Sequence, residues 1–155
     1  MCKSIQSQRS GWGLHLALGW LAPLIANGCP MTDETVLLLV EDEPVIALTL
    51  ETVLDDAGFA VFTAASGDEA IGILDEHISE IVGVITDIRL AGDKTGWDVA
   101  HYARKLKPDV AVVYMSGDSA ADWSSEGVPM SVMLSKPFAD AQLVTAMSTL
   151  LNQSG

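Results

Sequence analysis

The polar residues best suited to chemistry in this sequence each follow a short apolar run. Glu41 and Asp42 follow one run, Asp87 a second, and Ser116 and Lys136 a third and a fourth. Carboxylates about 4 Å apart repel each other by about 4 kcal/mol near a protein surface, so a cluster of them requires a cation or raised pKa values. Carboxylate oxygens suit Mg²⁺, which often completes its coordination shell with water and phosphate oxygens.

A carboxylate that lies beside Mg²⁺ and an ammonium group can attack a phosphorus centre. We therefore expect Asp87 to be the attacking group, with Mg²⁺ and Lys136 neutralising the charge on the transferring oxygens. Ser116 is expected to hydrogen-bond a phosphoryl oxygen. Glu43 is interpreted as a first-turn acid that favours a helix N-terminus rather than as a metal ligand.

The elements that would position these residues alternate regularly from residue 35 onward. Short apolar or β-branched runs, typical of strands covered on both faces, are followed by segments of helical period. The alternation predicts an α/β fold, a doubly wound five-stranded parallel sheet with helices on both faces and its site at the carboxyl ends of the strands. The expected strands are 36–40, 60–64, 82–86, 110–115 and 130–134.

The expected helices have recognisable ends. Pro44 opens the first and Gly58 ends it. Ser66, with Glu three residues later, forms a capping box that opens the second, and Pro108 stops the third. A short fourth helix is expected at about 120–124. The apolar positions of the last helix are Leu143, Ala146, Met147 and Leu150.

From about Thr35 to Leu151 the chain resembles the receiver domain of bacterial two-component response regulators. The resemblance implies a flavodoxin-like topology with strand order 2-1-3-4-5 and a cis peptide bond before Pro137. Its strongest parts are VLLLVEDE (36–43), VITD (84–87), VVYMSG (112–117) and LSKPF (134–138).

The resemblance also implies a role for each site residue. Asp87 would be the phosphoacceptor and a metal ligand. Asp42 would bind Mg²⁺ directly, Glu41 would assist through water, and the backbone carbonyl of Arg89 would be a further ligand. Lys136 would pair with Asp87 and then with the phosphoryl group, while the residue at position 116 would supply the family's hydroxyl.

A stand-alone cytoplasmic signalling domain of a phosphorelay is the function that the resemblance implies. The phosphoryl donor would be a histidine kinase or a histidine phosphotransfer protein, and the signal would pass by protein–protein contact. Such a domain is not an enzyme in the usual sense, because it catalyses only its own phosphorylation and dephosphorylation.

Two departures from the family leave a second hypothesis open. The family usually has an aromatic residue where this chain has Met133, and Tyr114 is a candidate substitute. The loop after Asp87 reaches Gly96 nine residues on rather than eight and lacks the usual Met-Pro pair. The alternative is a receiver-like interaction module that does not switch.

Two further classes fit the sequence less well. A Mg²⁺-dependent aspartyl phosphatase requires a second Asp two residues after Asp87, where this chain has Arg89. A flavin-binding domain of the same topology requires a phosphate loop after its first strand, where Glu41 and Asp42 would repel phosphate. The formal net charge of −13 argues against nucleic-acid binding, and for residues 31–155 against an anionic membrane.

Residues 1–30 differ from the rest of the chain, since they contain both cysteines and none of the 21 acidic residues. Their apolar stretch is too short and too interrupted for a membrane span. We expect an extension outside the domain, either a mis-assigned start before Met31 or a flexible tail; a membrane- or partner-contacting segment and an export signal are the alternatives. Residues 31–155 are expected to form one cysteine-free receiver domain suited to a reducing compartment.

Overall fold

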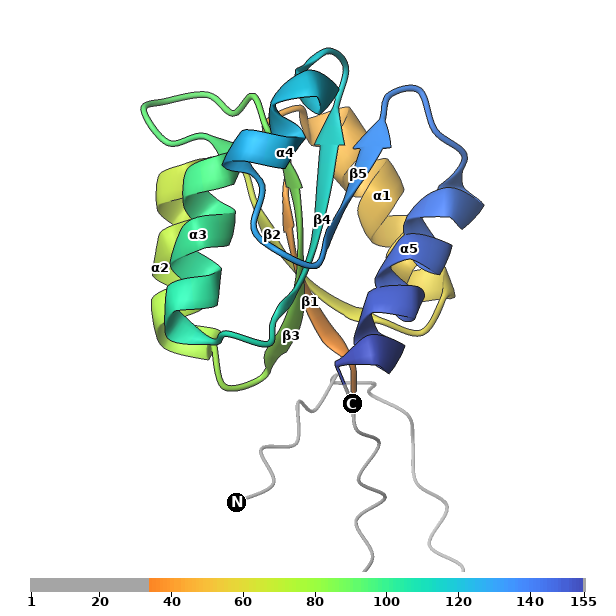
Figure 1. Cartoon of the computed structure of the whole chain (residues 1–155). Helices are drawn as coiled ribbons and strands as arrows, with labels where there is room; N and C mark the ends of the chain where they lie inside the picture. Colours follow the sequence, from red (N-terminus) through yellow and green to blue (C-terminus); the bar gives the residue numbers. More distant parts are fainter. Residues whose placement is uncertain (1–33, 155) are drawn as a thin grey trace, which may run out of the picture. The chain divides into compact units, whose positions relative to one another are not determined.

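The computed structural model describes residues 34–154, which contain one parallel β-sheet between two layers of helices (Figure 1). The strand order is β2-β1-β3-β4-β5, and every neighbouring pair is parallel. This order confirms the predicted α/β fold and topology. The strands are β1 Val36–Val40, β2 Ala60–Ala64, β3 Ile81–Asp87, β4 Ala111–Ser116 and β5 Ser131–Ser135.

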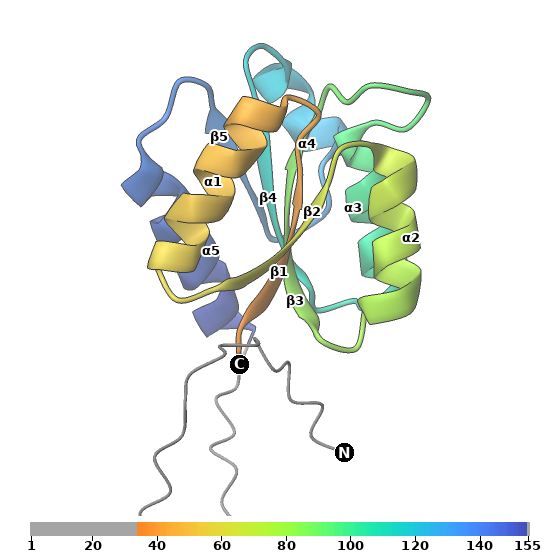
Figure 2. The same ribbon diagram turned by 180° about the vertical axis from the view of Figure 1, so that it is seen from behind.

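The helices α1 and α5 cover one face of the sheet, and α2 and α3 cover the other (Figures 1 and 2). A 3₁₀ turn, η1, and the short helix α4 lie near the carboxyl end of β4. Within residues 34–154, no helix combines the length and the hydropathy of a membrane span. The bounds are α1 Pro44–Asp56, α2 Gly67–His77, α3 Gly96–Leu106, η1 Ser119–Asp122, α4 Trp123–Glu126 and α5 Asp140–Gln153.

The central strand β1 shows why the apolar runs predict this architecture. Successive side chains of a strand point to opposite faces. Leu37 and Leu39 pack in the layer of α1 and α5, whereas Leu38 and Val40 pack in the layer of α2 and α3. All four are fully buried, so a continuous apolar run is what a strand covered on both faces requires.

The bounds of β1 and β2 agree with the prediction, whereas those of β3, β4 and β5 each differ from it by one residue at both ends. The prediction began β5 at Met130, but the strand begins at Ser131. Met130 has a positive φ of 55° and a side chain that is 68% exposed, so it belongs to the turn before the strand. The cis peptide bond between Lys136 and Pro137 is confirmed. The predictions for residues 1–30 lie outside the described residues.

Candidate functional site

Four strands deliver the predicted site residues to one edge of the sheet. Glu41 and Asp42 directly follow β1, Asp87 ends β3, Ser116 ends β4, and Lys136 directly follows β5. The register aligns Asp87 with Met115, the residue before Ser116. The carboxyl ends of parallel strands share one edge, so residues far apart in the sequence become neighbours there.

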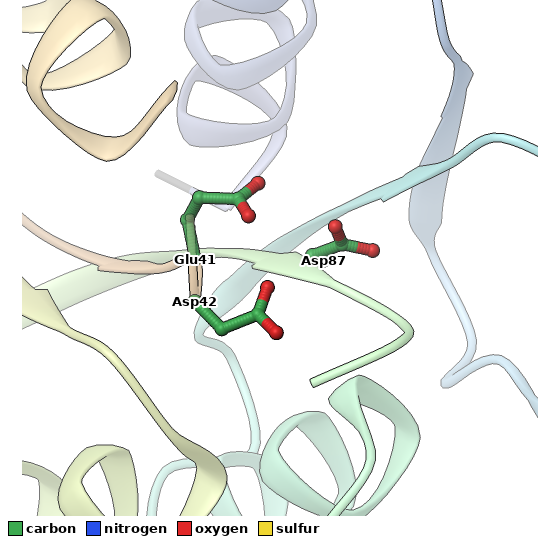
Figure 3. A group of neighbouring side chains, drawn as sticks. All are labelled: Glu41, Asp42 and Asp87. Carbon is green, nitrogen blue, oxygen red and sulfur yellow. The ribbon is translucent and has the colours of Figure 1, made fainter. Parts of the chain in front are cut away.

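Three carboxylates gather at this edge. Glu41, Asp42 and Asp87 each contribute one oxygen to a group in which all oxygens lie within 4.8 Å of one another. Figure 3 shows the side chains of Glu41 and Asp42 extending toward the side where Asp87 lies. Glu41 is 1% exposed and Asp87 is 9% exposed, so neither charge is fully hydrated by bulk water.

Lys136 supplies the opposite charge. Its Nζ donates hydrogen bonds to Oδ2 of Asp87 at 2.6 Å and to Oε2 of Glu41 at 3.3 Å. The side chain of Glu41 is fully buried, and that of Lys136 is 26% exposed. The ammonium therefore neutralises two carboxylates while it remains open to solvent on one side.

The environment shifts the pKa values of this pair. Burial raises the pKa of Glu41, and the charge of Asp87 adds to the effect, whereas the Glu43 N–H and Lys136 oppose it. Burial disfavours the ammonium of Lys136, but the carboxylates of Asp87 and Glu41 outweigh burial and raise its pKa. Lys136 consequently remains a cation at neutral pH.

Backbone donors fix the other oxygens of the two carboxylates. Oε1 of Glu41 accepts a hydrogen bond from the N–H of Glu43 at 3.1 Å. Oδ1 of Asp87 accepts one from the N–H of Arg89 at 3.1 Å. Each carboxylate thus has one oxygen on a local amide and the other on Lys136, an arrangement that holds both in a defined orientation.

Ser116 is 2% exposed and faces the segment that follows it. Its Oγ accepts hydrogen bonds from the N–H of Ser119 at 2.7 Å and of Asp118 at 3.2 Å. Its carbonyl oxygen accepts from the N–H of Lys136 at 2.8 Å. Ser116, the last residue of β4, is therefore joined by a backbone hydrogen bond to Lys136, the first residue after β5.

Sequence reasoning missed two features next to the site. The guanidinium of Arg89 forms an ion pair with Asp118 at 2.6 Å; nothing in their separation along the chain indicates this contact. A Cβ on Gly96 would collide with the carbonyl oxygen of Asp87. A glycine at the start of a helix, directly after the capping residue Thr95, was the available signal for this close approach.

Comparison with known proteins agrees with the geometry. A family model described as the response regulator receiver domain matches residues 37–148. A response regulator receiver protein from Sinorhizobium medicae WSM419 superposes with a TM-score of 0.76 at 45% identity, covering 79% of this chain and 98% of that one. The receiver domain of the sensor histidine kinase PA1611 from Pseudomonas aeruginosa PAO1, with magnesium coordinated in its active site cleft, shares the fold at 22% identity with a TM-score of 0.67, covering 77% and 98%.

Among curated proteins, the sensor kinase CckA of Brucella abortus is 30% identical over 132 residues, which are 83% of this chain and 14% of that protein. The chain spans between 14% and 53% of the length of the first curated relatives that it matches. The family match covers most of the five-stranded sheet and all four strand ends that build the acidic site. On this ground the chain belongs to the response regulator receiver domain family.

Proposed function

We propose that the chain is the phosphoacceptor signalling domain of a two-component phosphorelay, with Asp87 as the acceptor. The observation that carries the proposal is the contact of 2.6 Å between Nζ of Lys136 and Oδ2 of Asp87. This contact lies within a carboxylate cluster that needs a cation. A purely structural role does not readily explain why three buried or half-buried acids and one ammonium meet at the carboxyl ends of the strands.

The proposed reaction transfers a phosphoryl group from a phosphohistidine of the donor protein. An oxygen of the ionised Asp87 forms a bond to phosphorus while the phosphorus–nitrogen bond breaks. The imidazole nitrogen leaves with the electron pair of that bond and takes up a proton from solvent. Lys136, already next to Asp87, can turn its ammonium to the oxygens of the transferred group, and Ser116 can donate its hydroxyl hydrogen to one of them.

The donor set fits Mg²⁺. Asp42 and Asp87 would hold the ion directly, Glu41 through water, and the carbonyl oxygen of Arg89 would complete the protein ligands. The oxygen-only composition of the cluster supports this assignment, as does the magnesium in the cleft of the PA1611 receiver. The contact between Glu41 and Lys136 is consistent with an indirect role for Glu41. The bound ion would neutralise charge on the transferring oxygens.

A protein donor is supported by the surface beside the site. Helix α1 begins two residues after Asp42, and its outward side chains include Val45, 79% exposed, and Leu48, 65% exposed. Apolar side chains exposed beside a charged site favour docking of another protein over a small phosphodonor alone. The donor is therefore proposed to be a histidine kinase or a histidine phosphotransfer protein, with cytoplasmic signalling by protein contact.

Incubation of the full chain with Mg²⁺ and acetyl phosphate tests the proposal. Mass spectrometry should detect the addition of one phosphoryl group, which chelation of Mg²⁺ prevents. Asp87→Asn should abolish the addition. Asp93→Asn, the same change in the exposed loop after β3, should leave it intact. Modification of Asp87→Asn to the wild-type extent would disprove the assignment of Asp87.

One observation favours the alternative of a non-switching interaction module. Met133 occupies the position of the family's aromatic residue and packs, half-buried, against the α2/α3 layer, and a flexible thioether is a poor rotamer switch. A wild-type chain that binds Mg²⁺ but gains no phosphoryl group would favour this alternative.

The proposed domain bounds are 31–155, with residues 1–30 as an extension outside the domain. The family match, 37–148, falls inside these bounds, and the described elements run from Val36 to Gln153. A chain that lacks residues 1–30 should fold and become phosphorylated like the full chain. Loss of folding would show that the extension belongs to the domain.

A further inference from the structure

The loop between β3 and α3, residues 88–95, carries a proposed metal ligand but has little backbone structure of its own. Its residue Arg89 would offer a carbonyl oxygen to Mg²⁺. Within the described part of the chain, no backbone–backbone hydrogen bond involves residues 89–94. Residues 91–95 are exposed, and the loop contains no proline, which would fix a backbone angle. Contacts with other elements must therefore hold the path of this loop.

The start of α2 provides such a contact. The loop and the start of α2 lie at the same end of the domain in both views (Figures 1 and 2). Gly67 is the first residue of α2 and is buried. A Cβ on Gly67 would collide with the Cβ of Lys94 and would lie 3.2 Å from the carbonyl oxygen of Lys94. The loop can take its observed path only because position 67 has no side chain.

The glycine at position 67 serves space rather than backbone conformation. The glycines with a positive φ among residues 34–154 are Gly58 and Gly92, so the backbone at Gly67 is one that alanine also adopts. Alanine is the better residue within a helix. The close approach of Lys94 is thus the feature of the structure that requires a glycine here.

An added side chain at position 67 would displace the loop rather than the helix. The start of α2 is fixed by two hydrogen bonds, since Oγ of Ser66 accepts the N–H of Glu69 at 3.2 Å and Oε2 of Glu69 accepts the N–H of Ala65 at 2.8 Å. Ala70, in the first turn of the helix, is fully buried. Residues 89–94 have no backbone–backbone bonds that would resist a shift.

We propose that Gly67 is a positioning residue of the Mg²⁺ site, because the room it leaves for Lys94 lets the loop hold the carbonyl oxygen of Arg89 at the ion. The inference rests on the proposed Mg²⁺ site. Carbon atoms in contact lie about 3.5 to 4.0 Å apart, so a Cβ at position 67 would shift the loop by on the order of 1 Å. Mg²⁺ requires nearly ideal octahedral geometry, with oxygens at about 2.0 to 2.1 Å, and does not tolerate such a shift of a ligand.

Isothermal titration calorimetry of the full chain with Mg²⁺ tests the proposal. Gly67→Ala should weaken Mg²⁺ binding about tenfold or more, the effect typical of groups that orient metal ligands. Gly72→Ala is the matched control, because it makes the same change on the same helix where no other atom lies within 4 Å of the new Cβ. It should bind Mg²⁺ like the wild type.

Two changes of Lys94 show whether Gly67 acts through the loop. Lys94→Gly removes the Cβ that the new side chain would meet, so Gly67→Ala combined with Lys94→Gly should bind Mg²⁺ as tightly as Lys94→Gly alone. Lys94→Ala removes the same charge but keeps the Cβ, so its combination with Gly67→Ala should still bind weakly. This pair separates the contact from the effect of the Lys94 charge on the ion.

The outcomes distinguish this inference from the proposed function. If the wild type does not bind Mg²⁺, the proposed metal site fails and the positioning role fails with it. If the wild type binds Mg²⁺ and Gly67→Ala binds it equally well, only the positioning role is disproved, even where urea unfolding in Mg²⁺-free buffer shows a loss of stability. Weak binding by Gly67→Ala that Lys94→Gly does not restore also disproves it. If Gly67→Ala does not fold, the combination with Lys94→Gly decides: folding with restored Mg²⁺ binding supports the proposal, and any other result overturns it.

Discussion

Replacement of Lys136 by methionine removes the only ammonium that contacts the acidic cluster among residues 34–154. Methionine keeps most of the apolar stem, so the change isolates the charge. In its absence, the fully buried side chain of Glu41 and the side chain of Asp87, 12% exposed, face each other without a cation. We expect the variant to fold and to be less stable than the wild type in Mg²⁺-free buffer.

The size of the loss follows from the two contacts. At an effective dielectric constant of about 20, the distances of 2.6 and 3.3 Å correspond to attractions of about 6 and about 5 kcal/mol. Desolvation of the ammonium offsets much of this, and removal of one partner from a fully buried pair costs about 3 to 5 kcal/mol. Because Lys136 is 26% exposed, we expect a loss of about 2 to 3 kcal/mol in the free energy of unfolding.

Urea unfolding followed by circular dichroism measures this loss, with and without Mg²⁺. Lys105→Met is the matched control, since Lys105 is exposed on α3, and it should change stability by less than about 0.5 kcal/mol. A ligand that binds the folded state at about 100 times its Kd stabilises it by about 2.7 kcal/mol. Without the ammonium, the carboxylates of Lys136→Met should bind Mg²⁺ more tightly than those of the wild type. Mg²⁺ should therefore reduce the difference in the free energy of unfolding between wild type and variant.

Two results would refute this reasoning. Equal stability of Lys136→Met and Lys105→Met would show that Lys136 does not neutralise the cluster. A difference in the free energy of unfolding between wild type and Lys136→Met that stays constant or grows with Mg²⁺ would show that the carboxylates do not hold the ion at the place that the ammonium occupies.

Three further predictions follow from other parts of the described structure. Gly96→Ala should destabilise the chain by at least about 2 kcal/mol in urea unfolding, because the new Cβ would collide with the backbone of Asp87. Gly72→Ala on α2 is the control: its Cβ would meet no other atom, so this change should stabilise the chain by up to about 1 kcal/mol. Thr95→Ala should lose about 1 kcal/mol with the capping box of α3, and Thr95→Ser should restore most of it. Burial raises the pKa of Tyr114 above its usual 10.0, so on alkaline titration the unfolded chain loses this proton before the folded chain does. Above pH 10, the free energy of unfolding of the wild type relative to Tyr114→Phe should therefore fall by up to about 1.4 kcal/mol per pH unit. A constant difference between the two proteins in urea unfolding at alkaline pH would contradict this.

The sequence predicts most of this fold because the decisive information is local. The bounds of β1 and β2 agree with the prediction to the residue, since buried parallel strands require continuous apolar runs and turn residues interrupt them. The error at β5 has a local cause as well. Met130 continues the apolar run in composition, but its positive φ places it in a turn, and residue type alone does not indicate that backbone conformation.

The sequence predicts which residues meet at the site better than it predicts the hydrogen bonds that their side chains form. The rule that sites lie at the carboxyl ends of parallel strands brings Glu41, Asp87 and Lys136 together before any coordinates are known. The sequence does not reveal which partner each side chain selects. The hydroxyl of Tyr114 on the amide of Val128 is such a contact, because side-chain rotamers and loop paths decide it.

The ammonium in the site comes from the far end of the chain. Lys136 is 49 residues beyond Asp87 and 95 residues beyond Glu41. During synthesis the carboxylates leave the ribosome before the last strand, and Lys136 reaches them only once β5 pairs with β4. Under the proposed function, an unfinished chain therefore lacks the group that steadies Asp87 for reaction. The chain can thus accept a phosphoryl group only when the sheet is complete, so an incompletely synthesised chain does not signal.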